Sequence, residues 1–296
     1  MADGKRKLRL TWIDAVVLAA VTGFTVFIVR RVESVLNYTW DWGMVMPFFV
    51  YVDRQTGEWA LNLMIEGLIM TMRLAVYGII ASAVIGVVMG LARVSNNLFL
   101  RMIARSYVEL VRNIPPLVFI FIFYFFLSTQ LMPLLGIDEL ARSDSPTVQA
   151  IIRIVSGDPV LFSNFVSGLV CLSLFEGAYI TEIVRAGIQS IPRGQWEAGR
   201  AAGLSGFDVM RFVIMPQAVN RIAPPLANQF ITLIKDSSIV SLISIQELTF
   251  MAVEVGVSTS RIFEIWIITA AMYFAVCYLC VIFFNWLERR AARSRR

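Results

Sequence analysis

The sequence predicts an all-α fold: a polytopic helical membrane protein with about six transmembrane helices. Hydrophobic residues make up 58% of the 296-residue chain and charged residues only 16%, a balance far from that of soluble domains. Crossing a hydrocarbon core about 30 Å thick takes roughly 20 apolar residues in a helix. The apolar stretches lack the alternation of barrel strands, so we expect helices. They cover residues 13–29, 67–92, 107–132, 161–183, 222–245 and 263–287.

The first stretch looks like a secretory signal, because a basic start precedes its apolar core. Arg30 and Arg31 follow it without a convincing small-residue cleavage site, so we expect a retained anchor helix. The next twenty residues are rich in Trp, Tyr and Phe, which suits the outer membrane surface. We therefore expect two parts: residues 1–60 as an anchor helix with an aromatic outer-surface segment, and residues 61–296 as a five-helix core.

Small residues recur along the second stretch. Gly78, Ser82, Gly86 and Gly90 lie four positions apart and form a ridge that permits close helix contact. We expect this ridge to pack inside one subunit, with a seam between two subunits as the alternative.

The third stretch carries charge and is broken by proline. Arg105, Glu109 and Arg112 can share one helix face as an ion-pair cluster at the inner leaflet. Pro115–Pro116 follows, and proline interrupts a helix and frees backbone carbonyls. Freed backbone is tolerated at membrane depth where it lines a watery cavity. Asn113 is therefore predicted beside a candidate pathway.

Glu176, in the fourth stretch, is deep enough that ionisation is costly without a partner. A substrate ammonium group can supply that partner, with Ser173 and Tyr179 nearby on the helix. An internal ion pair with Lys235, or a protonated and hydrogen-bonded carboxyl, are the alternatives. Under the first hypothesis, Glu176→Gln is expected to depress transport while the complex stays assembled.

The fifth stretch is interrupted by Lys235–Asp236–Ser237–Ser238, about a dozen residues after Pro224–Pro225. We expect these four residues to act mainly as a structural clamp that locally unwinds the helix. Lys235 remains a candidate for a substrate carboxylate, and Asn228 for a polar ligand.

Residues 185–221, between the fourth and fifth stretches, are polar and basic. Gly203 falls where a helix stops, because glycine accepts the left-handed conformation that closes a helix end. Ser205 is expected to cap the next helix with Asp208 as the reciprocal acid. Pro192 and Pro216 are expected to bracket the unit. The pattern predicts a short helical hairpin outside the membrane.

Charge and composition exclude several classes. With both termini in the cytoplasm, Lys and Arg concentrate on the inner side, so the net charge of +5 indicates membrane topology rather than nucleic-acid binding. The chain has no histidine and no phosphate-binding P-loop. Its cysteines, Cys171, Cys277 and Cys280, lack partners for a metal site. We therefore expect no catalytic residue, metal or cofactor, and any ATP must be bound by a partner.

The hairpin resembles the EAA motif of bacterial ABC importer permeases. Glu197-Ala198-Gly199 is followed by Gly203, and nine residues separate that glycine from Val213-Ile214-Met215-Pro216. The departures are Gly199 for Ala, Val213 for Ile and Met215 for Leu. In that family the loop is cytoplasmic and docks into the ATPase subunit. The coupling residues that the resemblance implies are Glu197, Ala198, Gly199, Gly203, Leu204 and Pro216.

Four further segments, 107–116, 178–188, 228–230 and 233–238, resemble permeases of the polar amino acid uptake family (histidine, glutamine and general L-amino acid type). The resemblance implies a type I ABC importer permease fold in the bacterial cytoplasmic (inner) membrane. It also implies two ATPase subunits, a second permease subunit (identical or paralogous), and an extracytoplasmic amino acid-binding protein. The amino acid itself is not named. An ion-coupled secondary transporter and a non-transporting membrane scaffold are the competing hypotheses.

Overall fold

The computed structural model describes residues 11–53 and 57–293. The chain divides into two compact units, Met1–Met44 and Val45–Arg296. The first contains α1 (Trp12–Leu36) and the short helix η1 (Trp42–Met44). Thr11 and Asp14 form a capping box at the start of α1: the Thr11 hydroxyl accepts from the Asp14 amide at 3.4 Å, and the Asp14 carboxylate accepts from the Thr11 amide at 2.7 Å. Such reciprocal bonds satisfy amides that a helix start leaves open.

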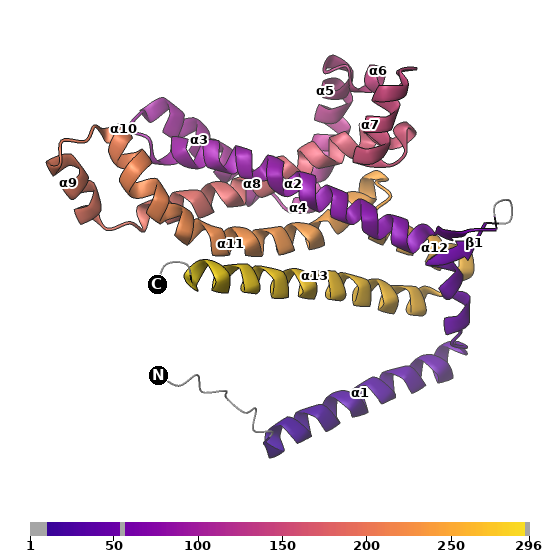
Figure 1. Ribbon diagram of the computed structural model, residues 1–296. Coiled ribbons are helices and arrows are strands. Elements are labelled where there is room, and N and C mark those ends of the chain that lie inside the picture. The colour runs from indigo at the N-terminus through magenta and orange to yellow at the C-terminus, as the bar shows by residue number, and fades with distance from the viewer. Residues whose placement is uncertain (1–10, 54–56, 294–296) are drawn as a thin grey trace. The chain divides into compact units, whose positions relative to one another are not determined.

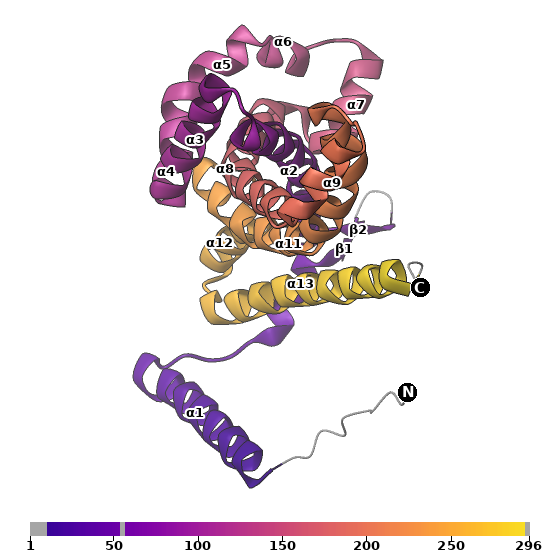
Figure 2. The same ribbon diagram turned by 90° about the vertical axis from the view of Figure 1, so that its left-hand side faces the viewer.

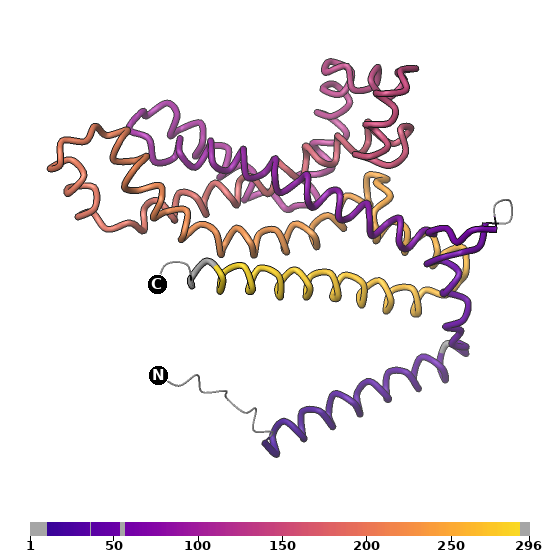
Figure 3. The backbone as a smooth tube through the Cα atoms, in the orientation of Figure 1, coloured from indigo at the N-terminus to yellow at the C-terminus, as the bar shows by residue number. Residues whose placement is uncertain are grey.

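The second unit is almost entirely helical (Figures 1 and 3). It departs from the all-α expectation in a small antiparallel pair of strands in which Tyr51 faces Ala60. The elements are η2 (Met46–Phe48), β1 (Val50–Val52), β2 (Trp59–Leu61), α2 (Leu63–Val94), α3 (Leu98–Asn113), α4 (Pro116–Ile122), the π-helical η3 (Phe123–Ser128), α5 (Thr129–Leu134), α6 (Ile137–Ala141), α7 (Pro146–Ser156), η4 (Pro159–Leu161), α8 (Phe162–Gln189), α9 (Arg193–Ala201), α10 (Gly206–Asp208), the π-helical η5 (Val209–Ile214), α11 (Met215–Asp236), the 3-10 helix η6 (Ser237–Ile243), α12 (Leu248–Thr259) and α13 (Ile262–Arg293).

The membrane spans agree with the predicted number. Within residues 11–53 and 57–293, five helical segments are long and apolar enough to cross a membrane, and a sixth is counted if Gly206–Ile243 and Leu248–Thr259, which meet at 53°, are one bent span. The five are Trp12–Val35, Leu63–Val94, Pro116–Leu134, Pro159–Gln189 and Ile262–Arg290.

The centre of the second unit is the contact between α2 and α8, with α11 packed beside them (Figures 1 and 2). The predicted ridge of small residues is buried in this contact. A Cβ atom on Gly90 would lie 2.6 Å from Cγ1 of Val184, and one on Gly86 would lie 2.6 Å from Cβ of Ile180. The expectation that the ridge packs within one subunit is therefore confirmed.

The predicted break at Pro115–Pro116 is confirmed, whereas the predicted hairpin boundary at Pro216 is wrong. The stretch 107–132 is divided: α3 ends at Asn113, and α4 begins at Pro116 after Ile114 has become extended, because a proline disfavours the helical conformation in the residue before it. Pro216, by contrast, does not end the hairpin. It lies in the first turn of α11 directly after the π-helical η5, and the chain stays helical through η5 into α11 (Figure 3), because local π-helical adjustment lets a helix accommodate proline.

A buried acid joins three helices at the end of the unit near the strands. Glu247 is fully buried. Its carboxylate accepts from the Tyr273 hydroxyl at 2.6 Å, from the Thr71 hydroxyl at 3.3 Å and from the Phe250 amide at 2.9 Å. These bonds connect α2, α12 and α13 and compensate for the cost of burying the carboxylate.

Candidate functional site

The first candidate site is the hairpin of α9 and α10, which lies beyond one end of the long helices α8 and α11 (Figure 1). Gly203 ends α9 with a φ of +81°. Its amide donates to the Arg200 carbonyl at 2.9 Å, and the Leu204 amide donates to the Gly199 carbonyl at 3.2 Å. These two bonds form a Schellman motif, in which the residue after the helix is left-handed. The predicted stop at Gly203 is confirmed.

The second arm of the hairpin begins at Ser205, as predicted. The Ser205 hydroxyl accepts from the Asp208 amide at 3.2 Å and donates to the Asp208 carboxylate at 2.6 Å. The Asp208 carboxylate thus accepts from the Ser205 hydroxyl, whereas in a full capping box it would accept from the backbone amide of Ser205. The cap still satisfies an open amide and fixes the direction in which the second arm leaves Gly203.

The hairpin is packed tightly onto the ends of α8 and α11. Gly199 is buried, and a Cβ atom there would lie 2.9 Å from Cγ2 of Val209, so the glycine allows the two arms to touch. Val209 and Ile214 are fully buried in a cluster with Ile188 and other apolar side chains of α8 and α11. The hairpin is therefore joined to both helices through one closely packed apolar cluster.

The outward surface of the hairpin carries two large aromatic side chains. Phe207 is 70% exposed and Phe212 is 61% exposed. Exposed aromatic side chains are typical of protein interaction sites. Neither residue is among the predicted coupling residues. Among those, Gly199 is buried, Leu204 is half-buried, and the exposed ones are Glu197, Ala198, Gly203 and Pro216.

The second candidate site is a cavity of about 530 Å³ between α3, α8 and α11. Arg112 enters it from α3, with its guanidinium carbon 5.1 Å from the centre of the Tyr179 ring. Arg221, from α11, donates to the Ser190 carbonyl at 2.8 Å. The other polar side chains of the lining are Glu182, Arg185 and Gln229. Cation–π contact with Tyr179 holds Arg112 over the cavity.

Glu176 lies behind the cavity wall. It is fully buried, and one carboxylate oxygen accepts a hydrogen bond from the side-chain amide of Gln229. The other oxygen, Oε1, has no hydrogen-bond donor within residues 11–53 and 57–293. The carboxyl group of Asp236 is its neighbour. A buried carboxyl group with an unfilled acceptor, next to the half-buried carboxyl group of Asp236, is an arrangement that a cationic donor would complete.

The predicted pathway residues are only partly brought together. Tyr179 lines the cavity, and Glu176 is joined to it through Gln229. The Ser173 hydroxyl instead donates to the Leu169 carbonyl at 2.6 Å within α8, and the Asn113 amide donates to the Glu109 carbonyl at 2.6 Å. Asn228 and Lys235 are exposed, outside the lining. Sequence reasoning missed Gln229, although it adjoins the predicted Asn228.

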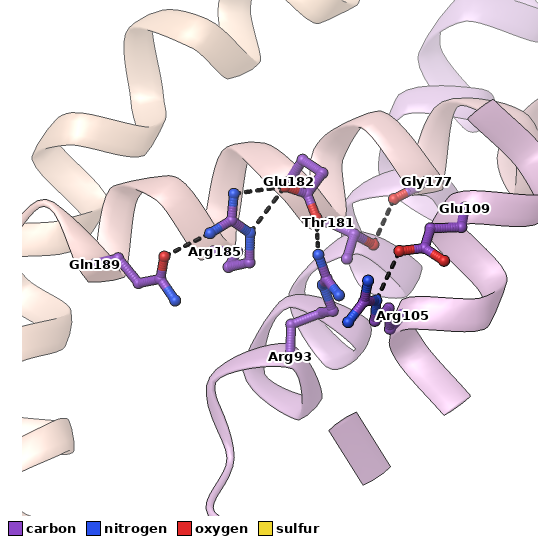
Figure 4. A network of polar contacts seen from close by, with 8 residues as sticks. All are labelled: Arg93, Arg105, Glu109, Gly177, Thr181, Glu182, Arg185 and Gln189. Atoms are coloured by element: carbon purple, nitrogen blue, oxygen red, sulfur yellow. Dashed lines mark hydrogen bonds and ion pairs between the residues drawn. The ribbon is translucent and has the colours of Figure 1, made fainter. Parts of the chain in front are cut away.

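A network of charges joins α2 and α8 at the hairpin end (Figure 4). The Glu182 carboxylate binds Arg93 at 2.9 Å and Arg185 at 2.7 Å, and Arg185 donates to Gln189 at 2.5 Å. On α3, Arg105 pairs with Glu109 at 2.6 Å, as the sequence predicts. Arg112, the third member of the predicted cluster, lies over Tyr179 instead. In the described part of the chain, no group of three or more Cys, Asp or Glu side chains is arranged to hold a metal ion.

Comparison with known proteins identifies relatives whose matched regions include the residues of both candidate sites. The family described as "Binding-protein-dependent transport system inner membrane component" matches residues 82–293. The "Probable amino-acid ABC transporter permease protein YckA" of Bacillus subtilis (strain 168) is 34% identical, over 77% of this chain and 88% of its own length. The "Glutamine transport system permease protein GlnP" of Escherichia coli (strain K12) is 33% identical, over 84% of this chain and 97% of its own.

Solved structures agree with this result. A chain from a crystal structure of an amino acid ABC transporter with histidines superposes with a TM-score of 0.61 at 33% identity, covering 77% of this chain and 94% of that one. The MetNI methionine ABC transporter, in an inward-facing conformation, shares the fold with a TM-score of 0.54 at 17% identity. The expected type I ABC importer permease fold is confirmed, and the ion-coupled transporter is disfavoured. This chain belongs to the family of inner-membrane components of binding-protein-dependent transport systems.

Proposed function

We propose that this permease subunit imports polar L-amino acids into the cytoplasm, driven by ATP that separate subunits hydrolyse. The observation that carries this proposal is the pairing of a cavity rich in arginine with a buried, incompletely bonded Glu176 behind its wall. An amino acid presents a carboxylate and an ammonium group, and the two ends of this site offer the opposite charges. The names of the relatives support the same substrate class.

In this proposal the substrate ammonium group replaces Gln229 or joins it on Glu176, with Asp236 adding negative charge. The substrate carboxylate faces Arg112 across Tyr179. A buried carboxylate is costly unless it is paired and hydrogen-bonded, so an arriving ammonium group gains more here than it would in water. Ser173, Asn113, Asn228 and Lys235 lack a direct contact with the substrate in this arrangement, because they lie outside the cavity lining.

The hairpin is proposed as the docking surface for the ATPase subunit. Its contact residues are Glu197, Ala198, Gly203 and Leu204, with Phe207 and Phe212 as the apolar anchors. Gly199 and Pro216 act indirectly, Gly199 by allowing close packing and Pro216 at the junction with α11. Closure of the ATPase dimer pushes the hairpin, and the buried cluster around Val209 passes the movement to α8 and α11.

The assembly proposed around this subunit has two ATPase subunits, a second permease subunit (identical or paralogous) and an extracytoplasmic amino acid-binding protein. Both termini and the hairpin face the cytoplasm of a bacterium, following the distribution of Lys and Arg. We keep the proposed division into an anchor with an outer-surface segment (1–60) and a five-helix core (61–296). The subunit binds no cofactor, since ATP belongs to its partners.

The test is uptake into proteoliposomes that contain the complete importer and its binding protein. Uptake of radiolabelled glutamine is expected to require ATP inside the vesicles and to persist with a protonophore. Glu176→Gln is expected to lower uptake at least tenfold while the complex still co-purifies, and Ser173→Ala, three residues away, is the matched control. Uptake that stops with the protonophore, or normal uptake by Glu176→Gln, would contradict the proposal.

A further inference from the structure

A second, smaller cavity lies where three helices end beside the hairpin. It has a volume of about 340 Å³ and draws side chains from the last turn of α2, the first turns of α3 and the last turns of α8. Four arginines line it, three of which appear in Figure 4. It shares only Arg185 with the larger cavity. The lining residues are Arg93, Leu98, Arg101, Met102, Arg105, Arg185 and Gln189.

The charges of this cavity are not balanced. Arg93 and Arg185 share the single carboxylate of Glu182, and Arg105 pairs with Glu109. Four guanidinium groups therefore meet two carboxylates. The Arg101 side chain makes no hydrogen bond or ion pair with any other residue that the structure describes. The positive end of the α3 dipole adds to the excess, since α3 begins at Leu98.

The buried donor of Arg93 points to a missing acceptor. Its side chain is only 17% exposed, and its Nε atom is buried without a hydrogen-bond acceptor in the described part of the chain. A buried N–H left unpaired is costly, and an anion in the cavity would supply oxygens to Arg101 and negative charge beside Arg93. The cavity thus has both the charge and the open donors of an anion site.

The surroundings of the cavity are apolar and lie at the ends of two membrane-spanning helices. The α2 and α8 spans end at Val94 and Gln189, next to the cavity. Leu98, Phe99 and Met102 of α3 are 59%, 69% and 57% exposed. Arginines beside exposed apolar side chains at the ends of spanning helices match the phosphate and the acyl chains of a lipid.

We propose that this cavity binds the phosphate of an anionic phospholipid, with Arg101, Arg105 and Arg93 on the phosphate and the acyl chains along Leu98 and Met102. The assignment to the cytoplasmic leaflet rests on the orientation given under the proposed function. An acidic segment of the ATPase is the other partner with the right charge, but the apolar side chains beside the arginines favour the lipid.

The test measures lipid retention by native mass spectrometry on the purified chain in detergent, with phosphatidylglycerol or phosphatidylcholine added. Arg101→Gln is the primary variant, because this side chain has no intramolecular bond to lose. One arginine near an anionic lipid surface is worth about a fivefold change in binding. We therefore expect Arg101→Gln to bind phosphatidylglycerol about fivefold more weakly and the double variant Arg101→Gln/Arg105→Gln about 25-fold more weakly. Phosphatidylcholine retention is expected to stay unchanged.

The matched control is Arg153→Gln, an exposed arginine beside the outer cavity that contains Leu61. It is expected to retain phosphatidylglycerol like the unmodified chain, and Arg101→Lys is expected to restore most of the binding. Equal retention by Arg101→Gln and Arg153→Gln would overturn the proposal. Full displacement of phosphatidylglycerol by soluble glycerol phosphate would also overturn it, because it would indicate a site for a free anion. Loss of ATPase co-purification by Arg101→Gln with unchanged lipid retention would overturn it as well. The lipid measurement needs neither substrate nor ATP, so its result is independent of the uptake test.

Discussion

Gly203 offers a direct test of how the hairpin supports coupling. Its φ of +81° lies in the left-handed region, and a Cβ atom there would meet no other atom within 4 Å. The cost of Gly203→Ala is therefore conformational alone, about 1–2 kcal/mol for an L-residue in this region. A cost of this size changes the population of the closed hairpin about 5- to 30-fold. Gly203→Asn is expected to cost less, since asparagine tolerates this conformation.

The assay compares ATPase binding and ATP-driven uptake among variants of one hairpin. Gly206→Ala is the matched control, because Gly206 also has open space around it but lacks a positive φ. Gly203→Ala is expected to weaken the association with the ATPase about 5- to 30-fold and to lower uptake in proportion. Gly203→Asp, which adds a charge to the same strain, is expected to abolish uptake. Gly206→Ala is expected to stay within about twofold of the unmodified chain.

Equal behaviour of Gly203→Ala and Gly206→Ala would refute this reasoning, because it would mean that the left-handed turn does not determine docking. Tight ATPase association by Gly203→Asp would argue against the hairpin as the contact surface.

Two further predictions concern buried hydrogen bonds. Gln229→Leu removes the donor to Glu176 and is expected to lower the free energy of unfolding by about 1–3 kcal/mol. The control Asn228→Leu, on the exposed side of the same helix, is expected to change the free energy of unfolding by less than about 0.5 kcal/mol. Equal shifts in thermal stability for the two variants would contradict the role of Gln229. Tyr273→Phe removes the 2.6 Å bond to the buried carboxylate of Glu247 and is expected to cost about 1–3 kcal/mol, with the exposed Tyr278→Phe as its control. Similar melting temperatures for these two tyrosine variants would rule out a structural role for that bond.

The features that the sequence predicted correctly are those that depend on neighbouring residues. Span number follows from local hydropathy and length, since the bilayer sets the length of each helix. The turn at Gly203 and the cap at Ser205 follow from residue chemistry within five positions. The ridge from Gly78 to Gly90 was also predictable, because its spacing repeats the helical period.

The prolines show where local rules fall short, since the break at Pro115–Pro116 was predicted correctly and the one at Pro216 was not. Pro115–Pro116 breaks a helix, whereas Pro216 lies in the first turn of α11 and Pro224–Pro225 inside it. The residue type is the same, and the outcome depends on whether the backbone carbonyls and the preceding turn find room in the fold. A π-helical turn, η5, comes directly before α11, and nothing within the local sequence indicated it.

The sequence by itself determined that this chain forms membrane-spanning helices and a polar hairpin with a glycine stop, because hydropathy, proline and left-handed turns act over a few residues. Only the tertiary structure decided that Gln229 rather than Asn228 faces Glu176, and that Arg93 of α2 shares Glu182 with Arg185 of α8. One residue along a helix rotates a side chain by about 100°. Which side is turned inward depends on the packing of helices far apart in the chain, and that packing is absent from any short stretch of sequence.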